Sequence, residues 1–171
     1  MSTGAHPADL ASQYNIPYTV CAHDSDIPNT GELFILLGAG LLSKECVRAK
    51  KIINCHSGLI PSSRGLDSFK WAIHFKRPLG ITLHYIDENI DAGEIISTIE
   101  TPILKSDSLE TLAKRHYELE INALSHFESH ISSPEFVKAI LKECLPTMRM
   151  PIATEQDIIS DFKSYKNHFL K

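Results

Sequence analysis

The sequence contains no apolar run long enough to span a membrane, and no signal peptide is visible at its start. Positive charge is not in excess, because 17 Lys and Arg stand against 21 Asp and Glu, which gives a formal net charge of -4. A nucleic-acid-binding surface requires clustered positive charge. These absences predict a cytoplasmic protein whose partners include neither a membrane nor nucleic acid.

Cysteine is scarce, and the residues present have neither disulfide-framework nor metal-site spacing. We therefore expect reduced thiols and no metal site. Cys55 stands between Asn54 and His56, so on a strand its side chain points to the opposite face and packs rather than reacts. With 43% hydrophobic and 22% charged residues, the composition is typical of one globular domain with a substantial core.

Apolar runs alternate with amphipathic stretches in the first half of the chain. After a helix tail at 6–14, we expect strands over 16–20, 32–37 and 51–55, the second buried on both faces, and a helix over 42–48. This alternation favours a parallel α/β sheet. The Gly-Ala-Gly turn before the helix is not a dinucleotide fingerprint, since it lacks the third Gly and the downstream acid.

The second half of the chain predicts a hairpin followed by helices. Residues 67–75 have an amphipathic helical pattern, whereas 79–87 and 94–103 are rich in β-branched side chains and read as a hairpin. A capping pair at Asp107 and Ser108 begins a long helix toward residue 127. Further helices are expected over 133–144 and from 152 onward, the last with these residues inward: Ile158, Ile159, Phe162, Tyr165 and Phe169.

The most informative chemistry lies between Asn54 and Asp91. A buried strand delivers Asn54 and His56, and the next strand leads into an acidic turn with Asp87 and Asp91. Sheets of this class place ligands at strand ends, so we expect Asn, His and Asp to meet at one sheet edge. An Asn amide stabilises a developing oxyanion, a His exchanges protons near neutral pH, and an Asp orients the ring and favours its charged form. The trio predicts acyl transfer to an amine that the substrate supplies.

The trio is part of a longer pattern of residues at defined spacing: Asn54, His56, Pro61, Arg64 and Gly65, then Gly80, Thr82, His84, Asp87, Asp91 and Gly93. This pattern resembles the formyltransferases that use 10-formyltetrahydrofolate, whose signature is roughly Asn-x-His-Pro-Ser-x-Leu-Pro-x-x-Arg-Gly, then Gly-x-Thr-x-His-x-x-Asp and Asp-x-Gly. The resemblance covers about residues 14–125. The chain departs from it at Ser57, where Pro is usual, and at Gly58, where Ser is usual.

The resemblance implies a Rossmann-like α/β sheet, mostly parallel with an antiparallel hairpin at one edge. It assigns residues 1–130 to the catalytic core and residues 131–171 to a helical C-terminal extension. Formyltransferases of this kind begin with a strand and a glycine turn well ahead of this chain's first strand. We therefore expect an N-terminally shortened sheet that lacks at least one strand–helix–strand unit.

The resemblance also assigns roles to individual residues. Asn54, His56 and Asp91 are implied as catalytic, with Asp87 as the rival acid. The formyl donor, 10-formyltetrahydrofolate, would be bound by two loops that contribute Gly38, Ala39, Gly40, Leu41, Leu42, Ile86, Asp87 and Asn89. The acceptor would be bound by Ser57, Gly58, Arg64 and Trp71, although Trp71 has an alternative interpretation as a core residue.

The implied function is formyl transfer to the amine of a small acceptor. The stretches 64–67 and 70–73 resemble short sugar N-formyltransferases, which favours a nucleotide-linked amino sugar as the acceptor, with glycinamide ribonucleotide as the alternative. A different class of function is a catalytically inactive, truncated remnant of the fold, which would bind folate or a partner protein through an exposed sheet edge. A homodimer is compatible with the sequence.

Overall fold

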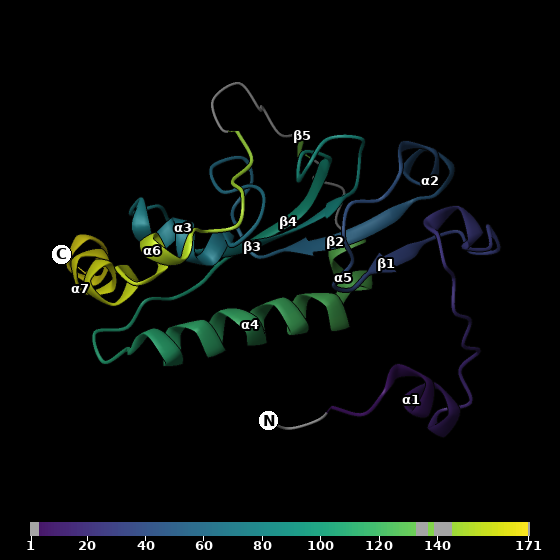
Figure 1. The fold of residues 1–171 in the computed structure, drawn as a ribbon, viewed down its shortest axis with the longest axis horizontal. Coiled ribbons are helices and arrows are strands. Elements are labelled where there is room, and N and C mark those ends of the chain that lie inside the picture. Colours follow the sequence, from purple (N-terminus) through teal and green to yellow (C-terminus); the bar gives the residue numbers. More distant parts are fainter. Residues whose placement is uncertain (1–3, 133–136, 139–144, 171) are drawn as a thin grey trace.

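One sheet with helices on its faces forms the body of the protein (Figure 1). The computed structural model describes residues 4–132, 137–138 and 145–170. The sheet has the order β1-β2-β3-β4-β5, with strands at Phe34–Leu36, Ile52–His56, Gly80–Tyr85, Glu94–Glu100 and Val137–Lys138. Strands β1 and β2 are parallel and are joined through helix α2, Lys44–Ala49.

The expected α/β class is confirmed, but the parallel part of the sheet is smaller than predicted. Among the pairings of the named strands, only β1–β2 is parallel, and β2–β3, β3–β4 and β4–β5 are antiparallel. The strand–helix–strand alternation correctly predicted the one parallel pair, β1 and β2. The hairpin of β3 and β4 was expected at one edge of the sheet, but it lies inside the sheet because β3 pairs with β2 and β4 pairs with β5.

Helix α4, Leu109–Ser125, lies along one face of the sheet (Figure 1). It begins as predicted, because the Ser108 hydroxyl accepts a hydrogen bond from the Thr111 amide while Thr111 bonds back to Ser108. Beneath it, alternate residues of the strands build a core with Ala123 of the helix: Ile53, Cys55, Ile81, Leu83 and Ile96. Cys55 is therefore a packing residue, and burial raises the pKa of its thiol to about 12.

The remaining helices are shorter. They are α1 at Pro7–Gln13, the 3-10 turn η1 at Asp24–Asp26, α3 at Ser68–His74, α5 at Phe127–Ile131, α6 at Ile152–Glu155 and α7 at Ile158–Phe169. Helices α3 and α7 pack together over a second core that includes Ala72, Ile73, Phe162 and Tyr165. None of the helices among the described residues is both long enough and apolar enough to cross a membrane.

Four sequence-based expectations need correction. Residues 16–20 form no strand, and residues 32–37 are not buried on both faces, because Ile35 and Leu37 are 39% and 71% exposed. The helix expected over 133–144 lies mostly outside the described residues, and residues 137–138 within it form β5. Ile159 is exposed rather than inward, since α7 presents Ile158, Phe162 and Tyr165 to the core.

A buried histidine makes the stability of this fold dependent on pH. His116 of α4 is 4% exposed, its Nδ1 lies 2.7 Å from the Thr101 hydroxyl, and burial lowers its pKa from 6.5 to about 4. Between pH 6.5 and about pH 4, His116 is therefore protonated in the unfolded chain but neutral in the folded chain. This contribution to stability is present above pH 6.5 and is lost as the pH falls toward 4.

We predict that His116→Gln, which does not titrate, has a flatter stability profile in this range. Denaturant midpoints measured from pH 7 to pH 4 should fall more steeply for the wild type than for the variant. The pKa of Asp107 is lowered to about 2, mainly by its hydrogen bond to Arg115, so that carboxylate loses its contribution only below this window. Parallel profiles for the two proteins would show that His116 does not titrate as inferred.

Candidate active site

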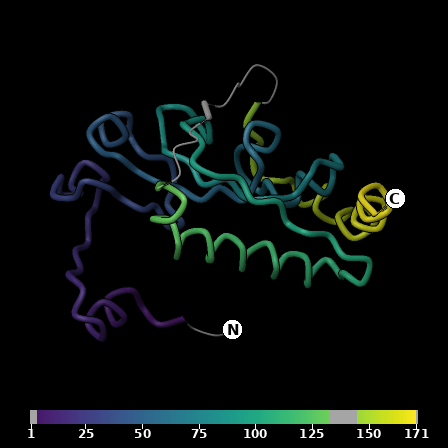
Figure 2. Tube along the Cα trace, turned by 180° about the vertical axis from the view of Figure 1, so that it is seen from behind, coloured from purple at the N-terminus to yellow at the C-terminus, as the bar shows by residue number. Residues whose placement is uncertain are grey.

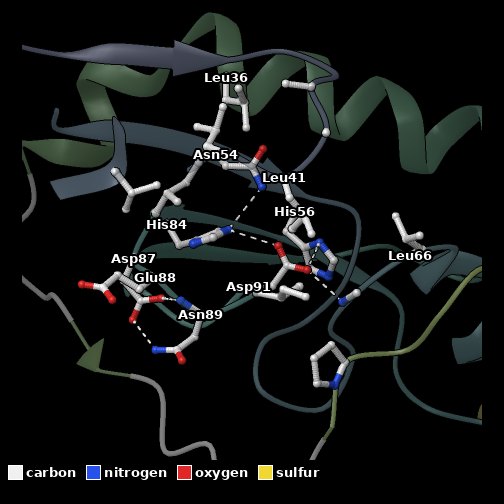
Figure 3. A pocket seen from close by; sticks show the side chains of 18 of the residues that line it. Leu36, Leu41, Asn54, His56, Leu66, His84, Asp87, Glu88, Asn89 and Asp91 are labelled. Carbon is white, nitrogen blue, oxygen red and sulfur yellow. Dashed lines mark hydrogen bonds and ion pairs between the residues drawn. The ribbon is translucent and has the colours of Figure 1, made fainter. Parts of the chain in front are cut away.

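Strands β2 and β3 bring three polar side chains to the sheet face opposite α4. Asn54 and His56 are two positions apart on β2, so they share a face, and the antiparallel register pairs Asn54 with His84. The Asn54 amide nitrogen lies 3.3 Å from His84 Nε2 (Figure 3). His84 Nδ1 is 3.0 Å from the Tyr85 carbonyl and donates to it, which leaves Nε2 free to accept from the amide.

Asp91 completes the site from the turn between β3 and β4. Its Oδ2 lies 3.4 Å from His56 Nδ1, and its Oδ1 lies 3.8 Å from His84 Nε2 (Figure 3). The Gly65 amide donates to Asp91 Oδ2 at 2.8 Å. One carboxylate therefore faces two histidine rings, and a main-chain donor fixes it in place.

The backbone of this turn is held by a buried cation. Asp91 adopts a left-handed conformation with φ of 45°, which is uncommon for a residue other than glycine. Arg64, 6% exposed, donates from Nε to the carbonyls of Ile90 and Asp91 at 3.0 and 2.9 Å. Arg64 thus positions Asp91 through the main chain, which is a different role from the acceptor binding that we expected for it.

The proton positions on His56 follow from the partner of Nε2, the ring nitrogen that does not face Asp91. His56 Nε2 lies 2.9 Å from the Ser63 carbonyl, which can only accept, so Nε2 carries a proton. The same nitrogen is 3.2 Å from the Ser68 hydroxyl, which itself donates to the Gly65 carbonyl. Nδ1 then meets Asp91 favourably when it is also protonated, so the geometry suits an imidazolium paired with a carboxylate.

His84 is a site residue that sequence reasoning did not select. It is 1% exposed, and burial lowers its pKa, opposed by the Tyr85 carbonyl and the Asp91 charge. A neutral ring with its proton on Nδ1 is therefore the form that orients the Asn54 amide. The available signal was its place in the Gly80–Thr82–His84–Asp87 pattern.

A cavity of about 460 Å³ opens beside these residues. Asn54, His56 and Asp91 line it. All the predicted donor-binding residues line it as well: Gly38, Ala39, Gly40, Leu41, Leu42, Ile86, Asp87 and Asn89. Its size and largely apolar wall, with a few convergent polar groups at one end, suit a small organic ligand. Glu120 of α4 adds a carboxylate to the wall.

The expected acceptor-binding residues lie outside the lining of this cavity. The Ser57 hydroxyl donates to Glu120 Oε2 at 2.7 Å, so Ser57 positions the carboxylate that does line it. A Cβ on Gly58 would come within 2.7 Å of the Ser63 carbonyl oxygen and 2.8 Å of His56 Nε2, which explains a glycine at this departure from the family pattern. Trp71 donates to the Met148 carbonyl at 2.8 Å and stacks on Phe75.

Asp87, the rival acid, has another partner. Its carboxylate accepts from the Asn89 amide at 2.8 Å and lies 3.4 Å from the Asn89 side chain. The acid that faces His56 in the structure is Asp91.

Comparison with known proteins identifies the family of this chain. The profile of the formyl transferase family matches residues 30–127, more than half of the 171 residues, and the chain therefore belongs to the formyl transferase family. The matched range contains β1 to β4 and all of α4, and every residue that lines the cavity except Pro146, Thr147 and Met148.

Two relatives show where the similarity lies. Phosphoribosylglycinamide formyltransferase of Bacillus subtilis is 41% identical over 71 residues, which cover 41% of this chain and 36% of that protein. Trifunctional purine biosynthetic protein adenosine-3 of Chironomus tentans is 28% identical over 155 residues, covering 80% of this chain and 11% of that protein. The chain thus spans about a third or less of the length of these relatives.

Solved structures share the fold. A sugar N-formyltransferase from a Shewanella species superposes with a TM-score of 0.67 at 21% identity, over 94% of this chain and 72% of that one. A phosphoribosylglycinamide formyltransferase from Anaplasma phagocytophilum gives a TM-score of 0.63 at 25% identity, over 86% and 82%.

Proposed function

We propose that this chain transfers a formyl group from 10-formyltetrahydrofolate to the amine of a small acceptor. The observation that carries this proposal is the convergence of Asn54, His56 and Asp91 at the polar end of a cavity with a largely apolar wall. The apolar loop residues, among them Leu41 and Ile86, suit the flat ring of a pterin. A structure from Anoxybacillus kamchatkensis with the same fold was solved with tetrahydrofolate bound.

In this proposal, the chain's residues stabilise one developing negative charge, donate one proton and accept another. The acceptor nitrogen attacks the formyl carbon, and the carbonyl oxygen gains negative charge. The Asn54 amide, oriented by His84, donates to that oxygen, and the His56 imidazolium stabilises it electrostatically. When the bond from the formyl carbon to the donor nitrogen breaks, His56 supplies that nitrogen with a proton. Asp91 accepts the proton that the acceptor amine loses, directly or through a water molecule, so charge and atoms balance.

Two acceptors remain as specific alternatives. A nucleotide-linked amino sugar agrees with the sugar N-formyltransferases among the structural relatives, and one of those was solved with a UDP-linked formamido sugar. Glycinamide ribonucleotide agrees with the identity to phosphoribosylglycinamide formyltransferase of Bacillus subtilis. Both are phosphorylated amines with free hydroxyls, and the Glu120 carboxylate held by Ser57 is placed to accept from such hydroxyls.

Calorimetry with a stable 10-formyltetrahydrofolate analogue tests the donor site. We expect the wild type to bind, and Leu41→Asp to bind at least about tenfold more weakly, because it places an unpaired charge on the apolar wall. Ile159→Asp is the matched control, since it makes the same change at an exposed residue of α7 away from the cavity. A well-folded wild type that binds no folate analogue would contradict the proposed donor.

Turnover assays with each acceptor then separate the alternatives. Release of tetrahydrofolate with only one of them identifies the acceptor class. Folate binding without turnover on either acceptor would favour a catalytically inactive remnant that acts as a binding module.

A further inference from the structure

A short segment from the C-terminal part of the chain closes one side of the cavity. We name residues 145–150 the strap, and three of them line the cavity: Pro146, Thr147 and Met148. In both views of the fold the strap lies next to α3 and leads into α6 (Figures 1 and 2). It lies outside the range 30–127 that the family profile matches, so the family motif assigns it no role.

The strap pairs with the loop that follows His56, as a short parallel strand would. Gly65 and Thr147 form a parallel bridge. In it the Thr147 amide donates to the Arg64 carbonyl at 2.8 Å, and the Leu66 amide donates to the Thr147 carbonyl at 2.9 Å. The Thr147 hydroxyl lies 2.9 Å from the Arg64 carbonyl and 2.8 Å from the Leu66 carbonyl, and it donates to one of them at a time. Thr147 therefore holds both neighbours of Gly65.

Two further hydrogen bonds attach the strap to the start of α3. Trp71 Nε1 donates to the Met148 carbonyl at 2.8 Å, and the Asp67 carboxylate accepts from the Met150 amide at 2.9 Å. Asp67 is the residue before α3, and Trp71 lies in its first turn. The strap is thus fixed to the body of the protein on both sides of the cavity wall that it forms.

Gly65 connects the strap to the carboxylate that faces His56. Its φ is 91°, and a Cβ on it would lie 2.2 Å from the carbonyl oxygen of Thr147 and 2.5 Å from its nitrogen, so glycine is required for this close approach. The Gly65 amide donates to Asp91 Oδ2 at 2.8 Å. That oxygen is the one that lies 3.4 Å from His56 Nδ1.

A single peptide unit joins these contacts, because the Arg64 carbonyl and the Gly65 N–H belong to the same amide. A trans peptide is planar, so its C=O and N–H point in opposite directions and turn together. Thr147 bonds the C=O end through its amide and its hydroxyl, and Asp91 accepts from the N–H end. Any rotation of this peptide that Thr147 prevents would turn the N–H away from Asp91.

From this linkage we propose that Thr147 is a positioning residue: by holding the Arg64 carbonyl, it directs the Gly65 N–H toward Asp91 and keeps that carboxylate against His56. The strap is then a working part of the active site as well as the connection to α6. The effect on turnover rests on the formyl transfer proposed above, whereas the effect on the Gly65 amide does not.

Hydrogen exchange of the Gly65 amide, followed by NMR on the full chain, tests the positioning without any substrate. Thr147→Val keeps the shape and the main-chain bonds but removes the hydroxyl. Since a hydrogen bond of this kind contributes modestly, we expect exchange about threefold to tenfold faster than in the wild type. Thr147→Ser, which keeps a hydroxyl, should stay close to the wild type. Equal exchange of the Gly65 amide in the wild type and Thr147→Val would overturn the proposal.

Thr154→Val is the matched control for these measurements. It makes the same change on α6, at a residue whose side chain has no hydrogen bond among the described residues. Its Gly65 exchange and its kinetics should match the wild type. A control that speeds Gly65 exchange as much as Thr147→Val does would show that the hydroxyl of Thr147 has no specific role.

Kinetics then show whether the positioning matters for turnover. We expect kcat of Thr147→Val to fall at least about fivefold with the donor dissociation constant unchanged, because a displaced carboxylate affects the reacting geometry and not the binding of the donor. In an Asp91→Asn background the same change should lower kcat no further, since the carboxylate that Thr147 positions is gone. Additive effects of the two changes would show that Thr147 acts elsewhere and would overturn the proposal.

The two kinds of measurement separate this inference from the proposed function. A wild type that binds no folate analogue and does not turn over would contradict the formyl transfer, and the Gly65 exchange would still decide the positioning. A wild type that turns over, with Gly65 exchange and kcat both unchanged in Thr147→Val, would leave the function standing and refute the role of Thr147.

Discussion

Replacing Asp91 with Asn should lower turnover by about 10²–10⁴-fold while folate binding changes little, because the proton-accepting group is lost but the shape is kept. The Asn side chain can still accept from the Gly65 amide, which now donates to Asp91 Oδ2 at 2.8 Å. The turn held by Arg64 is made of main-chain carbonyls and should survive the change. What disappears is the negative charge beside Nδ1 of His56. The measurement is kcat and KM for donor and acceptor across pH, with the donor dissociation constant from calorimetry.

Asp157→Asn is the control for this substitution, since Asp157 is an exposed carboxylate next to α7 and makes no side-chain hydrogen bond among the described residues. Its kinetics should match the wild type. If Asp91→Asn also matches an active wild type at every pH, the role assigned to Asp91 is wrong. If the variant loses folate binding as well, Asp91 acts in building the pocket and not in proton transfer.

The surroundings of the two histidines explain why one carboxylate between them does not make them equivalent. Nε2 of His56 is committed to the Ser63 carbonyl, so its Nδ1 is the nitrogen that meets Asp91. His84 has the reverse arrangement, with Nδ1 committed to the Tyr85 carbonyl and Nε2 facing both Asn54 and Asp91. Burial keeps His84 neutral by lowering its pKa. A charged ring for the reaction and a neutral ring for orienting an amide can therefore share one carboxylate.

The central trio was predictable from the sequence because strand geometry leaves little freedom. Asn54 and His56 share a face by the two-residue period, and Cys55 must take the other. The acidic turn follows the strand that pairs with them, so its carboxylates arrive at the same edge. The two cavity loops could also be predicted from the motif, because loop 38–42 comes just after strand β1 and loop 86–89 comes just after strand β3.

Other positions could not be read from the sequence because tertiary contacts decide them. Arg64 looks like a substrate-binding cation, but its burial against the carbonyls of the Asp91 turn becomes visible only once the chain has folded back. The alternating pattern at residues 14–20 does encode a strand, yet a strand forms only when another edge supplies its hydrogen bonds. The same missing partner explains why Ile35 and Leu37, in the apolar run 33–37, are exposed here.

Gly93→Ala should be the most destabilising single-methyl change at this site. A Cβ at this position would lie 1.8 Å from the carbonyl oxygen of Tyr85 and 2.8 Å from its carbonyl carbon, both main-chain atoms of β3. The backbone must shift to relieve that clash, and overpacking of this kind costs about 1–3 kcal/mol or more. The shift would also move Asp91, two residues earlier, away from His56.

Denaturant unfolding and turnover measured on the same preparation check this expectation. The midpoint should fall for Gly93→Ala, and turnover should fall further than the folded fraction alone explains, because the surviving folded molecules have a displaced carboxylate. Gly40→Ala is the matched stability control, since a Cβ there would meet nothing within 4 Å. A Gly93→Ala protein as stable as Gly40→Ala would show that the β3–β4 turn is wider than described. Unchanged turnover in a destabilised variant would instead show that more than one backbone conformation of the turn brings Asp91 to His56.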